Sequence, residues 1–317
     1  MNLPNPKQGD LYLLFHHLPY DFSAELPLAI GLGVCLDNTP QEWLDSSDQG
    51  LADYLLPGYS LSGMGLNNCC LRCFYQSSPD EELSKRDLLF FSVLALRLQS
   101  PIGISIGGEF RVGDKNDYIL APTLYEISSS WNGENCRHYT PETITAAGSI
   151  ADRLVKVKQL GLERLQTSLI FFSHVTIGFS KSSQLSYLGL FASLEALFVP
   201  SGNKAATLSR RVSNFLSNFQ FPEPMGKWIK DEYINGRHKL AHGIHDAAFG
   251  ATLSSSRREA FGRLHEITRL SLLGFLSLDD KKLNELSKDS GNSLQKVLDN
   301  LCGVSGPFLR NQEIWLG

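Results

Sequence analysis

The pattern of apolar residues changes at Thr140, and this change constrains the fold more than any other feature of the chain. Before it, short apolar runs are separated by clusters of Gly, Pro, Asn and Asp, which is typical of strands and turns. After it, apolar residues recur every three or four positions over long segments, which indicates helices. We therefore predict an α+β N-terminal domain over residues 1–139, an all-α antiparallel helical bundle over 140–278 and a C-terminal helical tail over 279–317.

The N-terminal domain is expected to contain short strands and one helix. The helix is predicted from an acidic first turn at residues 79–82 and an apolar body at 88–98. Glycines at 103–108 fall among predicted strands, where glycine usually marks a bend. We find no catalytic motif in this half and expect it to act as a sensor or regulatory domain. The predicted strands are residues 11–15, 29–36, 69–75, 102–106 and 123–127.

The bundle is expected to contain six helices. Thr140 and Pro141 suit an N-cap and a first helical residue, and Gly161 suits a helix end. Residues 184–199 are apolar nearly all round, so we place that helix at the centre. A capping box predicts that the last helix begins at Ser256. The other predicted helices are 140–161, 162–177, 204–219 and one that begins near residue 224.

Composition excludes several classes of protein. The chain has 317 residues, of which 42% are hydrophobic and 20% charged, so it can bury an ordinary core. No run approaches the roughly 18 apolar residues of a membrane-spanning helix, and the N-terminus does not resemble a signal peptide. Six cysteines are too few for a disulfide scaffold, which favours reduced thiols and a cytoplasmic location.

Charge is unevenly distributed along the chain. The net charge of -4 argues against a general nucleic-acid coat protein. Residues 201–270, however, hold eleven Lys and Arg against six Asp and Glu, a modest indication of an anionic partner. Solvated helix faces are the alternative explanation, and from charge alone we favour it.

Common catalytic and cofactor motifs are missing. The sequence has no phosphate-binding loop, dinucleotide fingerprint, nucleophile elbow or His-Glu-x-x-His motif. Cys70 and Cys73, beside Cys69, have the spacing of half a zinc site, with Cys136 and His138 as distant partners. Because a second tight pair is missing, we favour small apolar residues in a buried strand. We expect no metal and no cofactor.

The most informative stretch is residues 233–243, which contain Arg237 followed five positions later by His242 and then by Gly243. In an unbroken α-helix these two side chains would lie about 140° apart. Asn235 and Gly236 weaken the helix between Tyr233 and His242, and a symmetric dimer would bring two copies of the cluster together.

Such a cluster suits the cleavage of RNA. The 2′-hydroxyl must lose a proton as it attacks phosphorus, and the leaving 5′-oxygen must gain one; histidine can perform either transfer. Arginine stabilises the extra negative charge of the transition state, and no metal is required. Arg and His near a helix end also stabilise the helix dipole, so spacing alone is weak support for a function.

Several other polar residues fall near this stretch or on the bundle helices. Glu195 lies on the apolar stripe of its helix and must find a cation; Arg237, Arg210 and Arg211 are the candidates. It either orients Arg237 or forms a structural ion pair, and we favour the latter. The pairs Arg210–Arg211 and Arg257–Arg258 could line an RNA path, although solvated helix faces are the simpler explanation.

The C-terminal half resembles the HEPN superfamily, and most closely its Apea-like branch. The resemblance rests on the helical unit at residues 141–277, on Leu-Glu-Ala-Leu at 194–197 and on Tyr-x-x-x-Arg-His-x-x-x-His-Gly at 233–243. It implies a homodimeric bundle and, in many members, metal-independent endoribonuclease activity in toxins or antiviral defence effectors. Some members are instead non-catalytic nucleotide-binding or protein-interaction modules.

The resemblance also implies roles for individual residues. Arg237 would hold the scissile phosphate, and His242 would act as general base or acid. His238, Glu195, Tyr233 and Lys239 would support the site or bind RNA. The expected partners are RNA, a second copy of the chain and a regulatory or antitoxin protein, and no membrane.

Overall fold

A computed structural model defines two compact units, Met1–Val155 and Lys156–Gly317. The division falls inside a helix that begins at Pro141, whereas the sequence pattern placed the boundary ahead of that helix. The structure describes residues 9–18, 26–39, 69–75, 83–100, 104–111, 139–176, 183–199, 204–242, 255–287, 292–310, 312 and 314.

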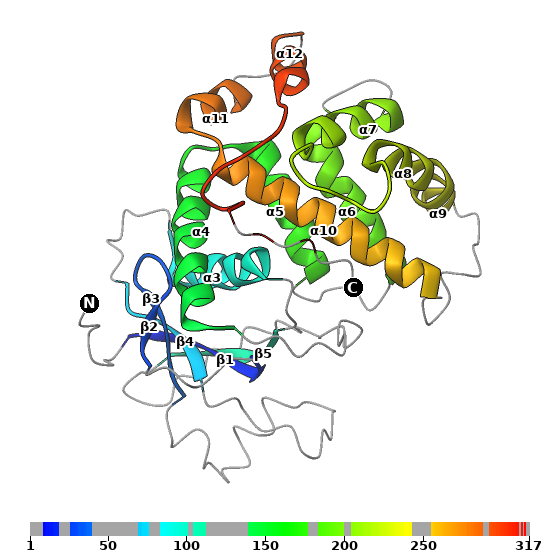
Figure 1. Cartoon of the computed structure of the whole chain (residues 1–317). Coiled ribbons are helices and arrows are strands. Elements are labelled where there is room, and N and C mark those ends of the chain that lie inside the picture. The colour runs from blue at the N-terminus through cyan, green and yellow to red at the C-terminus, as the bar shows by residue number, and fades with distance from the viewer. Residues whose placement is uncertain are drawn as a thin grey trace. The chain divides into compact units, whose positions relative to one another are not determined.

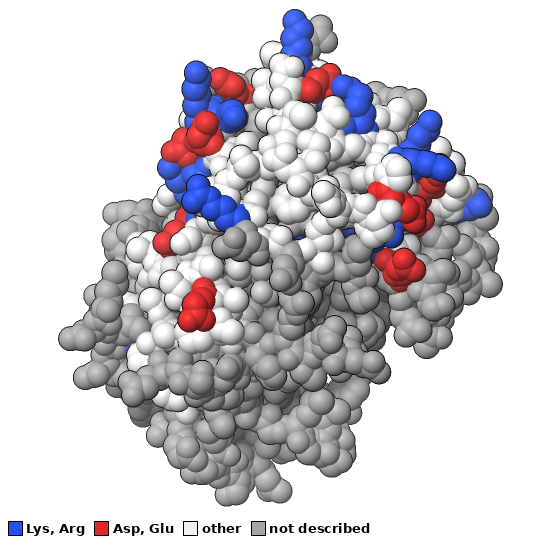
Figure 2. All heavy atoms as spheres, in the orientation of Figure 1, with Lys and Arg blue, Asp and Glu red and all other residues white. Residues whose placement is uncertain are grey.

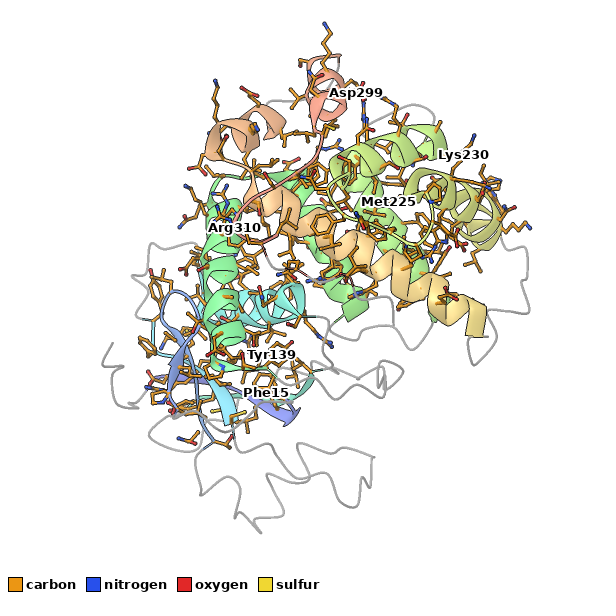
Figure 3. The ribbon with its side chains drawn as sticks, viewed as in Figure 1. Phe15, Tyr139, Met225, Lys230, Asp299 and Arg310 are labelled. Atoms are coloured by element: carbon orange, nitrogen blue, oxygen red, sulfur yellow. The ribbon has the colours of Figure 1, made fainter. Side chains whose placement is uncertain are left out.

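The first unit contains a five-stranded antiparallel sheet in the order β2-β3-β4-β1-β5 (Figure 1). All five residues of β4, in the middle of the sheet, are buried. Phe15 of β1 and Tyr139 are also fully buried (Figure 3). The mixed character predicted for this half is confirmed. The strands are β1 (Leu11–His17), β2 (Leu28–Ala29), β3 (Val34–Asn38), β4 (Cys69–Cys73) and β5 (Ser105–Arg111).

Two of the predicted strands differ in the structure. The single strand expected at 29–36 is a hairpin, because Gly31 and Gly33 take positive φ angles of 69° and 68° between β2 and β3. The strand expected at 102–106 is β5, which begins later and runs to Arg111. Its pairing with β1 shifts register beside Gly108, in agreement with the predicted glycine bend. The strand predicted at 123–127 lies outside the described residues.

Helix α3 (Lys85–Gln99) begins after the acidic turn predicted at 79–82. Its true start is a capping box: the Ser84 side chain accepts from the Asp87 backbone, and the Asp87 carboxylate accepts from the Ser84 backbone. At its far end, the Tyr139 hydroxyl donates to the Leu96 carbonyl at 3.2 Å. A local capping box thus fixes the start of α3, and a hydrogen bond from the distant residue Tyr139 fixes its end.

Helix α4 (Pro141–Gln159) follows its predicted signals closely. The Thr140 hydroxyl accepts from the Thr143 backbone at 3.3 Å, while the Thr140 backbone donates to the Thr143 hydroxyl at 2.8 Å. Gly161, with φ of 62°, takes the left-handed conformation just past the helix. The predicted N-cap and helix end are therefore confirmed.

The second unit consists of helices, as predicted for the bundle and the tail. Helices α5 and α6 are antiparallel, because Arg164 at the start of α5 donates to the Leu197 carbonyl at the end of α6. Nearer the middle, Ser168 and Ser193 share a buried 2.7 Å hydrogen bond. The elements are α5 (Glu163–Thr176), α6 (Ser183–Phe198), α7 (Lys204–Phe215), α8 (Met225–Glu232), η2 (Tyr233–His238), α9 (Lys239–Ala241), α10 (Ser255–Ser277), α11 (Asp280–Ser287) and α12 (Asn292–Asn300).

Helix α10 is buried on every side over residues 261–276, which the sequence did not predict. It packs against α5 and α6 (Figure 1). Glu266 and Arg269, which look like surface residues, form an ion pair of 2.7 Å at 1% and 0% exposure. The helix begins at Ser255, so Ser256 lies in its first turn rather than serving as the predicted cap.

In the part of the chain that the structure describes, no helix combines the length and apolar character needed to cross a bilayer.

Candidate functional site

The Arg237–His242 stretch lies at the end of one continuous helical segment formed by α8, η2 and α9. The sequence suggested that Asn235 and Gly236 interrupt this helix, but the segment continues through both residues. Instead, Tyr233–His238 forms a π-helix, whose hydrogen bonds join residues five apart and add one residue to the turn. This wider turn changes which side chains share a face, so the 140° separation expected for an unbroken α-helix no longer applies.

The π-helical turn is packed tightly around Gly236. The Tyr187 hydroxyl, from α6, donates to Glu232 Oε1 at 2.5 Å. A Cβ atom on Gly236 would lie 2.5 Å from each of these two oxygens, which is closer than real Cβ contacts. Because Gly236 has no side chain, the Tyr187–Glu232 hydrogen bond can lie directly against the helix backbone, and a Cβ atom at this position would force at least one of the two side chains to shift.

Arg237 is held in place by α6 and by its own helix. Its Nη2 lies 3.0 Å from Glu195 Oε1, and its guanidinium carbon lies 5.1 Å from the centre of the Tyr233 ring. The Tyr233 hydroxyl donates to the same Glu195 oxygen at 2.9 Å. Burial, with the adjacent Glu195 carboxylate, raises the pKa of Tyr233 to about 12, so the hydroxyl stays protonated and remains a donor. Arg237 keeps 25% of its side chain exposed.

Glu195 pairs with two cations. Of its three candidate partners, the structure gives Arg237, and the other carboxylate oxygen lies 2.8 Å from Nζ of Lys204. Lys204 is the first residue of α7, and nothing in the local sequence marked it as part of the site. Only the packing of α7 beside the end of α6 brings Lys204 to Glu195.

His238 and His242 come together at the exposed end of the segment. Their ring centroids are 4.3 Å apart with an interplanar angle of 61°, and both side chains are exposed. Lys239 between them is exposed too. Among the described residues, no hydrogen bond joins Arg237 to His242. The predicted site residues thus form two neighbouring groups. Arg237 and Tyr233 of the π-helical turn are anchored by Glu195 of α6, and His238 and His242 are exposed at the end of the same helical segment.

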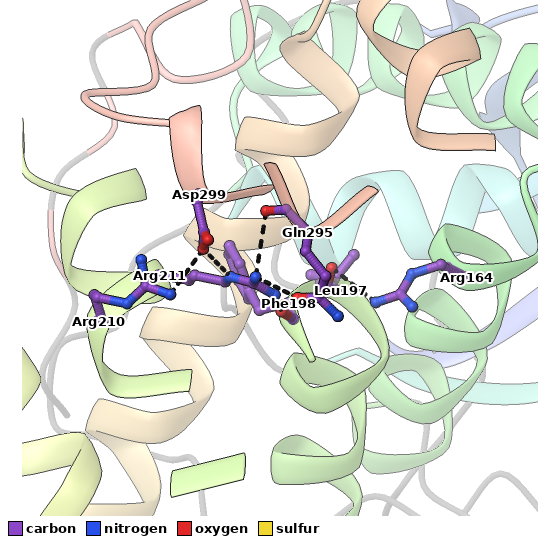
Figure 4. A network of polar contacts seen from close by, with 7 residues as sticks. All are labelled: Arg164, Leu197, Phe198, Arg210, Arg211, Gln295 and Asp299. Carbon is purple, nitrogen blue, oxygen red and sulfur yellow. Dashed lines mark hydrogen bonds and ion pairs between the residues drawn. The ribbon is translucent and has the colours of Figure 1, made fainter. Parts of the chain in front are cut away.

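Arg210 and Arg211 do not belong to this site. Arg211 is 2% exposed and donates to Asp299 at 2.7 Å and to the Phe198 carbonyl at 2.5 Å, with further bonds to Gln295 (Figure 4). Arg211 of α7 therefore caps the C-terminal end of α6 and links both helices to α12. Arg210 is half exposed and pairs with the same Asp299. Because Arg211 is buried, it cannot line an RNA path together with Arg210, as one interpretation of the sequence had it. The side chains of Arg257 and Arg258 lie outside the described residues.

The cysteine cluster lies in the sheet of the first unit. Cys69, Cys70 and Cys73 are fully buried in β4, and burial raises the pKa of all three thiols, to about 12 for Cys69. Such thiols are packing groups rather than thiolate ligands. No group of three or more His, Cys, Asp or Glu side chains in the described ranges is arranged to hold a metal ion. Cys136 and His138 lie outside those ranges.

Comparison with known proteins does not assign a family or a function to this site. No protein-family model matches the chain, and neither the curated proteins nor the solved structures gave a significant match.

Proposed function

We propose that the chain is a metal-independent endoribonuclease whose site is built on Arg237, His238 and His242. One observation carries the proposal: two exposed histidines with rings 4.3 Å apart follow directly on an arginine that a carboxylate and a tyrosine hold in place. Charge stabilisation and proton transfer are the two functions that RNA cleavage requires, and this segment supplies groups for both.

In the proposed reaction, one histidine takes the proton of the ribose 2′-hydroxyl while that oxygen attacks the adjacent phosphorus. The bond from phosphorus to the 5′-oxygen then breaks, and the second histidine gives a proton to the leaving oxygen. Arg237 donates to the non-bridging oxygens, whose negative charge grows in the transition state. The products are a 2′,3′-cyclic phosphate and a 5′-hydroxyl, and DNA is spared because it lacks the nucleophile.

The HEPN-like identity of the bundle is part of this proposal. It is supported by the order of the helices and by the position of the arginine and histidine motif at a helix end against α6. A homodimer, a role in defence or as a toxin, a regulatory or antitoxin partner and a cytoplasmic location follow from the same resemblance. On the face drawn in Figure 2, basic and acidic side chains of the described residues are interspersed, so this face presents no extended basic field.

The test is cleavage of single-stranded RNA by the purified full-length chain in excess EDTA, with end-group analysis of the products. Arg237→Ala and His242→Ala should each abolish cleavage while the protein stays folded. His174→Ala provides the matched control, since His174 is an exposed histidine on α5. Full activity in both site variants would reject the assignment, as would cleavage that requires a metal.

A non-catalytic binding module is the second candidate, and the Glu195–Arg237 ion pair favours it. An arginine whose charge is compensated by a carboxylate also has a purely structural use. This candidate predicts no cleavage under any condition and a rise in the melting temperature when a nucleotide is added.

A further inference from the structure

We propose that Lys204 is a second phosphate-binding residue, which contacts the RNA strand beside the phosphate held by Arg237. The inference deepens the proposed function and rests on it. Its basis is a pairing that connects three elements: the Glu195 carboxylate on α6 pairs with Arg237 of η2 through one oxygen and with Lys204 of α7 through the other.

The two cations are presented at one place on the surface. Lys204 Nζ lies 2.8 Å from Glu195 Oε2, and Arg237 Nη2 lies 3.0 Å from Glu195 Oε1. Glu195 itself is 11% exposed, whereas Arg237 is 25% and Lys204 51% exposed. The carboxylate therefore lies beneath the two cations, which remain accessible to an anion from solvent.

The charges at this place do not cancel. Two cationic side chains, Arg237 and Lys204, share the Glu195 carboxylate, so this group of three side chains carries one unit of positive charge. An ammonium group has three N–H donors and a guanidinium has five, and the bond to Glu195 uses one of each set. The remaining donors can bind phosphate oxygens while Glu195 keeps both side chains in place.

The position of Lys204 in its helix adds a second observation. Lys204 is the first residue of α7, a helix of 12 residues with no acidic residue in its first turn. A cation is unfavourable there because a helix N-terminus carries partial positive charge. The helix end therefore adds to the positive potential of Arg237 and Lys204, and a bound phosphate would stabilise all three.

The experiment measures binding of the full-length chain to a single-stranded 2′-O-methyl RNA, which cannot be cleaved because the nucleophile is blocked. Fluorescence anisotropy over a series of salt concentrations gives the affinity and its salt dependence. Lys204→Gln should weaken binding about three- to tenfold and reduce the slope of log K against log salt by about 0.7, the value for one lost phosphate contact. Lys204→Arg should restore both values.

Lys156→Gln is the matched control, because Lys156 is also an ion-paired, half-exposed lysine of the second unit, bonded to Asp280. It should leave affinity and slope unchanged. If the wild-type chain does not bind the RNA, both this inference and the proposed function fail. If the wild type binds and Lys204→Gln keeps the wild-type affinity and slope, Lys204 is not a phosphate-binding residue and the proposed function stands.

Discussion

The Glu195 carboxylate on α6 and the Arg237 guanidinium in the π-helical turn form an ion pair of 3.0 Å. The Tyr233 hydroxyl donates to the same carboxylate oxygen, so three side chains from two elements form one small network. The network fixes where the guanidinium lies relative to the helix end that carries the two histidines.

Replacing Glu195 tests whether this network contributes more to the free energy of unfolding than an exposed surface ion pair does. Glu195→Gln keeps the shape of the side chain but removes the charge that faces Arg237 and Lys204. We expect the free energy of unfolding to fall by about 1–2 kcal/mol, because the pair is largely buried and charge-assisted. Urea denaturation of Glu195→Gln, Arg237→Met and the double variant should give a coupling energy above about 0.5 kcal/mol. Additive effects of the two changes would show that the ion pair does not contribute to stability.

Gly236→Ala should destabilise the protein, although Ala is the better helix former by about 1 kcal/mol. The new Cβ would lie 2.5 Å from the Tyr187 hydroxyl and from Glu232 Oε1, and Tyr187 is fully buried, so moving its ring would disturb the packing around it. We expect a loss of about 1–3 kcal/mol, measured by urea denaturation. Adding Tyr187→Phe removes one of the two clashing oxygens and should recover part of the loss. A more stable Gly236→Ala variant would contradict the close packing of Tyr187 and Glu232 around Gly236.

The sequence predicted correctly those features that depend on the residues themselves and on their near neighbours in the chain. Thr140, Pro141 and Gly161 marked the ends of α4 correctly, since capping depends on side chains within a few positions of the helix end. The Glu195–Arg237 pair was among the predicted options, because a carboxylate on an apolar stripe must find a cation.

The features that the sequence missed depend on contacts between distant segments. In the π-helical turn, Gly236 packs against Tyr187 of α6, and a glycine in a helical pattern does not by itself distinguish a π-turn from a break. Lys204 reaches Glu195 only through the packing of α7 beside α6. Residues 261–276 looked amphipathic because Glu266 and Arg269 are charged, yet these two residues satisfy each other inside the core.

Arg211 and Arg210 are neighbours in sequence that should behave very differently. Arg211 is 2% exposed and donates to Asp299, to the Phe198 carbonyl and to Gln295, so Arg211→Ala removes several buried hydrogen bonds and leaves the Phe198 carbonyl at the end of α6 without this donor. We expect a loss of about 3 kcal/mol or more in the free energy of unfolding. Arg210, at 52% exposure, should lose less than about 1 kcal/mol on the same change. Equal losses in chemical denaturation would contradict the capping role of Arg211.

Acid should weaken the attachment of α12 through Asp299. The hydrogen bond from Arg211, with a further one from Arg210, holds the pKa of the Asp299 carboxyl below its ordinary value. The folded state therefore binds this proton less tightly than the unfolded chain, whose Asp pKa is about 3.9. The stabilisation is complete above that value and is lost as the pH falls through the lower pKa of the folded state.

The corresponding measurement compares the wild type with Asp299→Asn in urea at about pH 7, 5 and 3. The wild type should be more stable by at most about 1 kcal/mol at the two higher values, because Asp299 is 36% exposed and solvent screens its pairs. The difference should shrink at the lowest value, where the carboxyl begins to protonate. Asp231→Asn, on the exposed surface of α8, controls for the removal of any surface carboxylate. A difference that grows as the pH falls would contradict the lowered pKa.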